Sequence, residues 1–316
     1  MGEFELIRRH FAGLAPDGVG IVLGIGDDAA ILDVPPDRQL VVTTDALVAG
    51  RHFPERTAAA DVGWKSLAVN LSDLAAMGAE ARWLTLALSL PHLDDAWVAG
   101  FSQGFGDLAR SAGVALVGGD ITRGPLTISV TAMGLVPRAC ALRRSGARAG
   151  DWVVVTGSLG DAAAALDRFE QAGSEPTGFE AELRRRLERP VPRLDEGRAL
   201  LELASAAIDV SDGLVADLGH VCTASEVGAD LEAARFPASA ALMALIPDAQ
   251  TRLRFQATGG DDYELCLCIP PDRLDQAIRV CELTPIGRIS ATPGVRLRAL
   301  DGTLHAFEKY GFDHFA

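Results

Sequence analysis

The sequence predicts an α/β protein of two domains, and three observations support this fold class. A chain of 316 residues with 48% hydrophobic content is long enough to bury two cores. Helical and strand patterns alternate along residues 3–136, as expected of helices packed on a sheet. A polar connection over residues 137–150 interrupts the pattern, which starts again at Trp152. We therefore expect an N-terminal domain over residues 1–140 and a C-terminal domain over residues 141–316.

The first half begins with a helix over residues 3–13, in which Phe4, Ile7 and Phe11 share one side. The next apolar run, near residues 39–44, has a Leu-Val-Val centre that predicts a strand buried on both faces. The other elements are expected as a helix over 58–77, a strand over 83–90, a helix over 94–111, a strand over 114–117 running into Gly118-Gly119-Asp120, and a strand over 127–136.

The helix over residues 58–77 carries an acid inside an otherwise apolar segment. Ser66, Asn70 and Asp73 follow one another at i, i+4 and i+7, apart from the apolar stripe. A solvated face is the alternative, but it would carry charges at more positions. The spacing alone leaves both interpretations open, and the composition of the face, which mixes these polar residues with Met77, favours a polar site around Asp73.

The second half repeats the alternation of strands and helices. The helices over 179–189 and 192–206 carry arginines, for which a solvated face is the simplest interpretation. The expected elements are a strand over 152–156, an alanine-rich helix after Asp161, those two helices, a strand over 207–210, a helix from Leu214, and strands over 263–269, 284–289 and 295–299.

Composition excludes several classes of protein. A formal net charge of -14 argues against a nucleic-acid binder with a broad basic face. No apolar run reaches the ~18 residues of a membrane helix, and the N-terminus shows no signal-peptide pattern, so we expect a cytoplasmic protein without membrane contact. The five cysteines are scattered without CxxC spacing, which predicts neither disulfides nor a zinc site; Cys266 and Cys268 are expected to be buried.

Acidic residues recur where apolar runs end. The segments are Gly24-Ile25-Gly26-Asp27-Asp28, Thr43-Thr44-Asp45, Gly118-Gly119-Asp120, Asp209-Val210-Ser211-Asp212 and Gly259-Gly260-Asp261-Asp262. Carboxylates brought close repel one another unless a cation neutralises them. Magnesium takes oxygen ligands and shares them with phosphates, so the pattern predicts a site with several Mg²⁺ ions that holds the phosphates of a nucleotide.

Other residues fit the same chemistry. Thr43, Thr44 and Ser211 offer neutral oxygens beside the acids, and Arg144 is a candidate clamp for charge on a transferring group. The glycines before Asp120 allow the backbone to approach a phosphate closely. No G-x-x-x-x-G-K-[ST] segment occurs, so a Walker-type loop is absent from the sequence.

The motifs together resemble the thiamine-monophosphate kinase family. The resemblance runs in order through the segments above, and it includes His52-Phe53, residues 70–78, Gly118 to Gly124, Gly213-Leu214, Tyr263-Glu264-Leu265 and the closing Gly311-Phe312-Asp313-His314-Phe315. It implies the two-domain fold of the aminoimidazole ribonucleotide synthetase (PurM-like) superfamily, with an N-terminal α/β domain whose sheet pairs across a homodimer and a C-terminal α/β domain that completes the cleft. It also implies direct transfer of the ATP γ-phosphate to thiamine phosphate, the last step of thiamine diphosphate biosynthesis.

The resemblance also implies roles for individual residues. His52, Asp261 and Phe312 match positions that hold thiamine phosphate. The nucleotide contacts implied are Gly119, Asp120, Arg144 and Ser211. The implied magnesium ligands are Asp28, Thr43, Thr44, Asp45, Asp73, Asp120, Asp209 and Asp212.

The sequence departs from the family where Asp261 stands in place of the usual Glu, and a tyrosine expected near Ser102 and Gln103 is missing. Three alternatives remain. A sister enzyme of the superfamily could use the same ATP site on another acceptor. Such enzymes are expected to carry a reactive cysteine near the N-terminus or to end in a cysteine, whereas here the first cysteine is Cys140 and the last residue is Ala316. A two-metal phosphatase or nuclease would use similar carboxylates. A calcium-stabilised structural protein is the third, but the D-x-[DN]-x-[DN]-G loop is missing.

Overall fold

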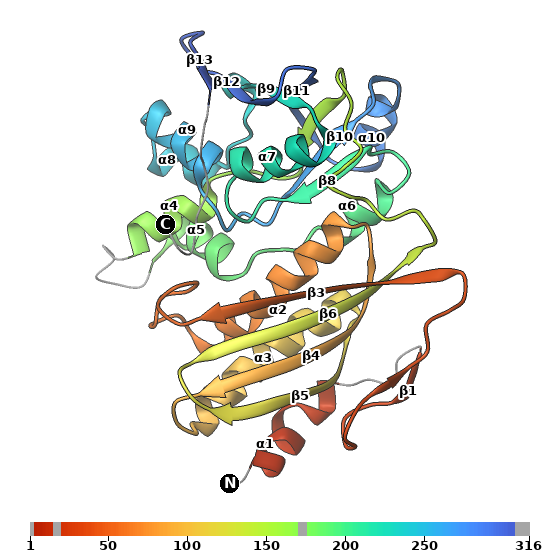
Figure 1. Ribbon diagram of the computed structural model, residues 1–316. Coiled ribbons are helices and arrows are strands. Elements are labelled where there is room, and N and C mark those ends of the chain that lie inside the picture. Colours follow the sequence, from red (N-terminus) through yellow and green to blue (C-terminus); the bar gives the residue numbers. More distant parts are fainter. Residues whose placement is uncertain (1–2, 15–19, 170–175, 307–316) are drawn as a thin grey trace. The chain divides into compact units, whose positions relative to one another are not determined.

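The computed structural model describes residues 3–14, 20–169 and 176–306 (Figure 1). The chain packs as two compact units. Unit 1 comprises Met1–Leu74 and Ala79–Cys140, and unit 2 comprises Ala75–Gly78 and Ala141–Ala316. Each unit is built on a sheet of its own.

Unit 1 has a four-stranded sheet in the order β3-β6-β4-β5, with helices on one face (Figure 1). Strand β6 pairs antiparallel with both β3 and β4, whereas β4 and β5 are parallel. The elements are α1 (Glu3–His10), η1 (Ala12–Leu14), β1 (Ile21–Leu23), β2 (Ile31–Leu32), β3 (Arg38–Val48), α2 (Ala59–Ala76), β4 (Glu80–Leu90), α3 (Asp95–Ala112), β5 (Ala115–Arg123) and β6 (Thr127–Pro137).

Helices α2 and α3 approach each other closely because glycine lies at their contact. A Cβ on Gly63 would collide with the Phe101 carbonyl, and one on Gly104 would collide with the Ala60 carbonyl. Helix α3 begins at Asp94, whose carboxylate accepts two backbone N–H groups of the first turn. These two helices bury one face of the sheet.

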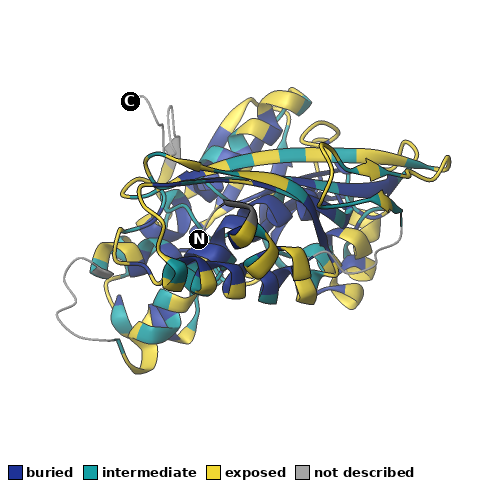
Figure 2. Ribbon diagram, turned by 90° about the horizontal axis from the view of Figure 1, so that it is seen from below, coloured by how far each residue is buried: buried dark blue, intermediate teal, exposed yellow. Residues whose placement is uncertain are grey.

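The other face of this sheet is open, which corrects one prediction. The strand at residues 39–44 was expected to be buried on both faces, but Leu40 and Val42 are 44% and 55% exposed. Exposed positions alternate with less exposed ones along the long strands in Figure 2. The apolar run reflects strand propensity as well as burial, and β3 is an edge strand covered on one side only.

The glycine pair before Asp120 lies inside β5, whereas the sequence predicted that the strand would end before it. Gly119 has φ +154°, and a Cβ there would collide with the carbonyl of Leu86 on the neighbouring strand. The strand continues because glycine permits this close pairing.

Unit 2 has a seven-stranded sheet in the order β13-β12-β9-β11-β7-β10-β8, with parallel pairing only between β12 and β9 among the described strands. Its strands are β7 (Trp152–Val155), β8 (Ala206–Asp209), β9 (Gly228–Glu232), β10 (Leu265–Ile269), β11 (Thr284–Ser290), β12 (Gly294–Arg298) and β13 (Leu304–Ala306). Its helices are α4 (Asp161–Phe169), α5 (Gly178–Glu188), α6 (Leu194–Ala199), α7 (Leu214–Ser225), η2 (Ala233–Arg235), α8 (Ala240–Leu245), α9 (Ala249–Thr258), η3 (Pro271–Arg273) and α10 (Leu274–Val280).

Both faces of the unit 2 sheet are covered. Along β10, Cys266 and Cys268 face a core that includes α7, while Leu265, Leu267 and Ile269 face a second core. Both thiols are free and buried, as predicted, and burial raises the pKa of each.

The predicted helix over 58–77 and the strands over 83–90 and 127–136 are confirmed to within three residues at each end. The shorter elements β1, β2, β9, β13, α8, α9 and α10 were missed. Among the described helices, none is long and apolar enough to cross a bilayer.

Candidate active site

The first group of predicted ligands meets where β3 faces α2. Thr43 and Asp45 are two positions apart on β3, so their side chains share a face. The Thr43 hydroxyl donates to Asp73 Oδ2 at 2.5 Å, and the Asp45 backbone N–H donates to Asn70 Oδ1 at 2.9 Å. Asn70 and Asp73 lie one turn apart on α2, so their side chains are neighbours.

The polar face of α2 is buried, as the spacing of its residues predicted. Ser66 and Asn70 are fully buried, and the Asn70 side-chain amide donates to the Ser66 carbonyl at 3.0 Å. Asn70 thus donates a hydrogen bond to its own helix and accepts one from β3. This arrangement fixes the backbone of Asp45 relative to Asp73.

Thr44 and His52 are held by the backbone of unit 1. The Thr44 hydroxyl donates to the Val130 carbonyl at 3.0 Å, on the opposite side of β3 from Thr43 and Asp45. His52 Nδ1 accepts the Val48 N–H at 3.0 Å. The neutral imidazole therefore carries its proton on Nε2, which makes Nε2 the hydrogen-bond donor of the ring.

Asp120 and Asp28 lie apart from this group. The register aligns Asp120 with Ala87, Ser129 and Ala46 across the whole sheet. Three strand spacings, about 14 Å, therefore separate its backbone from β3. Asp28 is exposed on the turn between β1 and β2. Within the described ranges, no three His, Cys, Asp or Glu side chains gather as a metal site.

The second group lies in unit 2, where β8 ends at Asp209 and the chain turns into α7. Asp217 Oδ2, one turn into the helix, accepts the backbone N–H groups of Ser211, Asp212 and Gly213 at 3.0, 3.1 and 3.1 Å. Burial raises the pKa of Asp217 to about 8, and the charges of Asp209 and Asp212 add to the increase. The Asp217 carboxyl thus lies close enough to those of Asp209 and Asp212 to feel their charges.

A second loop packs directly on the first. The Asp261 N–H donates to the Ser211 carbonyl at 2.9 Å, and the Tyr263 N–H donates to the Val210 carbonyl at 2.8 Å. Asp261 and Tyr263 have φ +68° and +50°, in the left-handed region, and the Tyr263 hydroxyl donates to Asp261 Oδ1 at 3.0 Å. A Cβ on Gly260 would stand 2.5 Å from the Ser211 carbonyl oxygen, so glycine is needed for this contact. The two loops therefore form one platform.

Asp262 anchors this platform through its side chain. Its Oδ2 accepts the Gly160 N–H at 2.8 Å, at the start of α4. Burial raises the pKa of Asp262 well above its usual value, and the nearby charges of Asp161 and Glu264 act in the same direction. The side chain of Asp161 is held by the hydroxyls of Ser158 and Ser239 at 2.8 and 2.7 Å.

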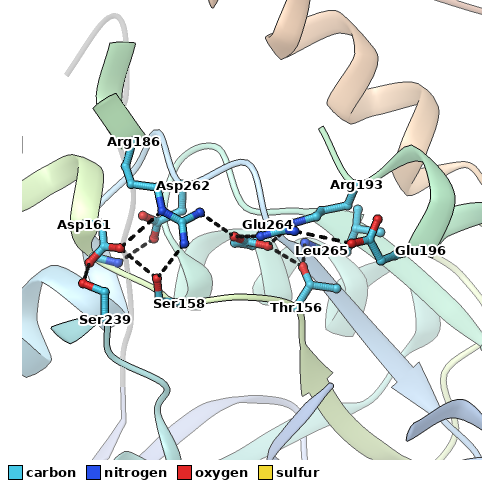
Figure 3. Close-up of polar contacts among 11 residues, drawn as sticks. Thr156, Ser158, Asp161, Arg186, Arg193, Glu196, Ser239, Asp262, Glu264 and Leu265 are labelled. Carbon is cyan, nitrogen blue, oxygen red and sulfur yellow. Dashed lines mark hydrogen bonds and ion pairs between the residues drawn. The ribbon is translucent and has the colours of Figure 1, made fainter. Parts of the chain in front are cut away.

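Glu264 is the centre of a buried ionic network (Figure 3). Arg193 donates two hydrogen bonds to its carboxylate, both at 2.6 Å, and the Thr156 hydroxyl donates a third at 2.6 Å. Arg186 also reaches it, at 3.5 Å. Arg186 and Arg193 were expected on solvated faces, and that prediction is wrong for both. Their shared partner Glu264 lies 78 and 71 positions away in the sequence, so the periodicity of the helices could not indicate these contacts.

Arg144 is exposed in the turn before β7, and its carbonyl accepts the Ser225 hydroxyl at 3.0 Å. The Ser225 oxygen in turn accepts the N–H groups of Gly146 and Ala147. The turn is thereby fixed to the end of α7. Phe312 lies outside the described residues.

Comparisons with known proteins place these features in a family. The models of AIR synthase related proteins match residues 26–136 with the N-terminal domain and residues 148–299 with the C-terminal domain. Thiamine-monophosphate kinase of Salmonella typhimurium is 45% identical over 322 aligned positions, which cover 100% of this chain and 98% of the relative. The chain belongs to the thiamine-monophosphate kinase family.

Two solved structures agree with this membership. The thiamine-monophosphate kinase from Stenotrophomonas maltophilia K279a is 48% identical with a TM-score of 0.85, covering 90% of this chain and 92% of that chain. A structure described as AaThiL complexed with AMPPCP and TMP is 33% identical with a TM-score of 0.81, covering 92% of each chain. The predicted two-domain PurM-like α/β fold and the predicted resemblance to thiamine-monophosphate kinases are both confirmed.

Three residues of this family member were not predicted as part of the site. Glu264 was quoted only as part of a motif, and neither Arg193 nor Asp217 was singled out. Asp217 carried a usable signal, because it is an acid inside the apolar helix that begins at Leu214. The same kind of signal identified Asp73.

Proposed function

We infer that the chain phosphorylates thiamine phosphate with ATP, giving thiamine diphosphate and ADP. The observation that carries this inference is the 45% identity to a thiamine-monophosphate kinase over the whole chain. The structure of the 33% identical neighbour with AMPPCP and TMP supports it further, because AMPPCP is an analogue of ATP. ATP is then a co-substrate of this chain.

The donor set around both groups of acids fits Mg²⁺. Carboxylate and hydroxyl oxygens are hard ligands, and Mg²⁺ is commonly held by one or two carboxylates together with phosphates and water. Fewer than three acidic side chains are therefore sufficient to hold a Mg²⁺ ion when a triphosphate is bound. When bound, Mg²⁺ would neutralise charge on the phosphates. The proposed ligands are Asp28, Thr43, Thr44, Asp45, Asp73, Asp120, Asp209 and Asp212.

The chain's other site residues are proposed to bind and orient the two substrates. Gly119, Asp120, Arg144 and Ser211 are proposed contacts of ATP. His52, Asp261 and Phe312 are proposed contacts of thiamine phosphate. The Nε2–H of His52 supplies a hydrogen-bond donor, and Tyr263 holds the carboxylate of Asp261 in one orientation.

Direct in-line transfer needs no nucleophile from the protein. The acceptor is a phosphate monoester, which is largely ionised near neutral pH, so positioning and charge neutralisation can carry most of the rate. The exposed Arg144 guanidinium is proposed to stabilise charge on the transferring group. Trapping a phosphorylated enzyme that turns over at the catalytic rate would contradict direct transfer.

The open face of the unit 1 sheet is proposed to pair with a second copy in a homodimer. Leu40, Val42 and Val48 expose apolar surface along β3, which favours a protein partner over water. Val42→Glu is expected to shift the protein from dimer to monomer in analytical ultracentrifugation. Val280→Glu, at a similarly exposed position on α10, serves as the control and is expected to remain dimeric. A monomeric wild type contradicts the proposal.

The function is tested with purified protein, ATP, Mg²⁺ and thiamine phosphate, by chromatography of the thiamine products. Thiamine diphosphate is expected, with no diphosphate formed from free thiamine. Hydrolysis of ATP without an acceptor would instead indicate a phosphatase. Magnesium-dependent ATP binding without product would indicate a sister enzyme with another acceptor.

A further inference from the structure

We propose that Asp217 is a positioning residue. It holds the Ser211–Gly213 loop so that Asp209 and Asp212 are placed for Mg²⁺. It also occupies the backbone N–H groups of that loop, so that they cannot bind phosphate. This inference rests on the proposed function, because it concerns how the same site receives Mg²⁺-ATP.

One carboxylate oxygen of Asp217 holds the Ser211–Gly213 loop. Asp217 Oδ2 accepts three consecutive backbone N–H groups, from Ser211 to Gly213. The side chain is only 2% exposed and is carried on the first turns of α7, among buried neighbours such as Leu214 and Leu218. A buried acceptor on a packed helix fixes the loop that donates to it.

The backbone N–H groups of the Ser211–Gly213 loop are not available to phosphate. The start of a helix, where backbone N–H groups are unpaired, is a common binding place for phosphate. Here the N–H group of Gly213, the residue before α7, and those of Ser211 and Asp212 ahead of it are directed to Asp217. Phosphate oxygens must therefore reach this loop through its side chains. Asp212 in the loop and Asp209 just before it are carboxylates, so a bridging cation is required wherever these two acids meet a phosphate.

The Ser211–Gly213 loop is also packed tightly against its neighbours. A Cβ on Gly213 would stand 2.9 Å from the backbone of Thr258, and Gly260 approaches the Ser211 carbonyl as closely. The Ser211–Gly213 loop therefore cannot shift without displacing the loop that carries Asp261. Asp217 fixes both loops through one carboxylate oxygen.

The test is isothermal titration calorimetry of the full-length protein with Mg²⁺-ATP, in the absence of thiamine phosphate, so that no turnover is needed. Asp217→Ala removes the acceptor and is expected to weaken binding about 10- to 100-fold, the usual effect of losing a residue that orients metal ligands. Asp217→Asn can present its amide oxygen at the same place and is expected to bind close to wild type. ATP without Mg²⁺ is expected to bind weakly to every variant.

Asp151→Ala is the matched control. The Asp151 side chain is 4% exposed and accepts the Arg148 N–H at 2.9 Å and the Ser205 hydroxyl at 2.6 Å. It lies before β7, at the end of the sheet opposite to Asp209. This variant is expected to unfold at a lower temperature but to bind Mg²⁺-ATP as tightly as wild type.

The outcomes separate the two inferences. A wild type that does not bind Mg²⁺-ATP overturns the proposed function and the role of Asp217 with it. Wild-type binding together with unchanged binding in Asp217→Ala overturns the positioning role alone, as does an equal loss in Asp217→Asn. If Asp217→Ala does not fold, Asp217→Glu keeps the carboxyl group but moves its oxygens by one methylene. Unchanged binding in that variant overturns the positioning role.

Discussion

Replacing Arg193 by methionine tests the buried ionic network of unit 2. Methionine keeps much of the side-chain volume but removes the guanidinium, and it leaves the Glu264 carboxylate with the Thr156 hydroxyl at 2.6 Å and the more distant Arg186. Glu264 is only 2% exposed, so water cannot replace the two lost hydrogen bonds.

The expected loss is large because one partner of a buried pair remains charged. Removing one member of such a pair destabilises proteins by about 3–5 kcal/mol. For a domain of the size of unit 2, this corresponds to a fall in unfolding temperature of about 6–20 °C. The double variant Arg193→Met with Glu264→Gln is expected to regain part of the loss, because its buried group is neutral.

The assay is urea unfolding followed by circular dichroism, with Arg198→Met as the control. Arg198 lies on α6, which begins directly after Arg193, and it pairs with Asp195. Both of these side chains are exposed, so the loss of Arg198 should change stability by less than about 1 kcal/mol. An Arg193→Met protein as stable as the Arg198→Met control would refute the reasoning.

Two further predictions concern single carboxylates. Asp73→Asn keeps an acceptor for the Thr43 hydroxyl but loses the charge, so turnover should fall by more than about 100-fold in a thiamine diphosphate assay while the unfolding temperature changes little. Near-normal turnover would contradict the role of Asp73. The pKa of Asp262 is raised, so the folded state binds a proton that the unfolded state has released, and stability falls as pH rises above about 4. Asp262→Asn removes this pH dependence. The stability of the variant relative to wild type should therefore increase from pH 4.5 to 8.5 in thermal unfolding. A constant difference would contradict a raised pKa of Asp262.

Long elements with strong periodicity could be predicted from the sequence. Helix α2 and strands β4 and β6 contain many residues of one pattern, so local preference and tertiary packing agree. Short elements such as β9 and β13 contain too few residues to show a period, and β13 depends on its pairing with β12. The position of Asp120 could not be predicted for a different reason, because its distance from Asp45 depends on the strand order β3-β6-β4-β5.

The two groups of site residues also differed in how far they could be predicted. Thr43 and Asp73 were both predicted as ligands, and they are hydrogen-bonded to each other. The family resemblance implied their ligand roles, and the sequence itself pointed to Asp73, because an acid inside an apolar helix is costly unless it has a partner. The pairing of Glu264 with Arg193 depends instead on a contact between residues distant in sequence, which no local pattern encodes.

The end of α2 and the two residues after it restrict how the protein can be divided into fragments. Ala75–Gly78 belongs to unit 2, where Ala75 and Ala76 share a core with Leu200 and Leu203. A fragment that starts at Ala141 therefore lacks part of its own interior and would expose apolar surface to water. No single cut in the chain yields two intact halves. Any division of this gene into separately expressed pieces must supply the four-residue segment in trans or graft it onto the second piece.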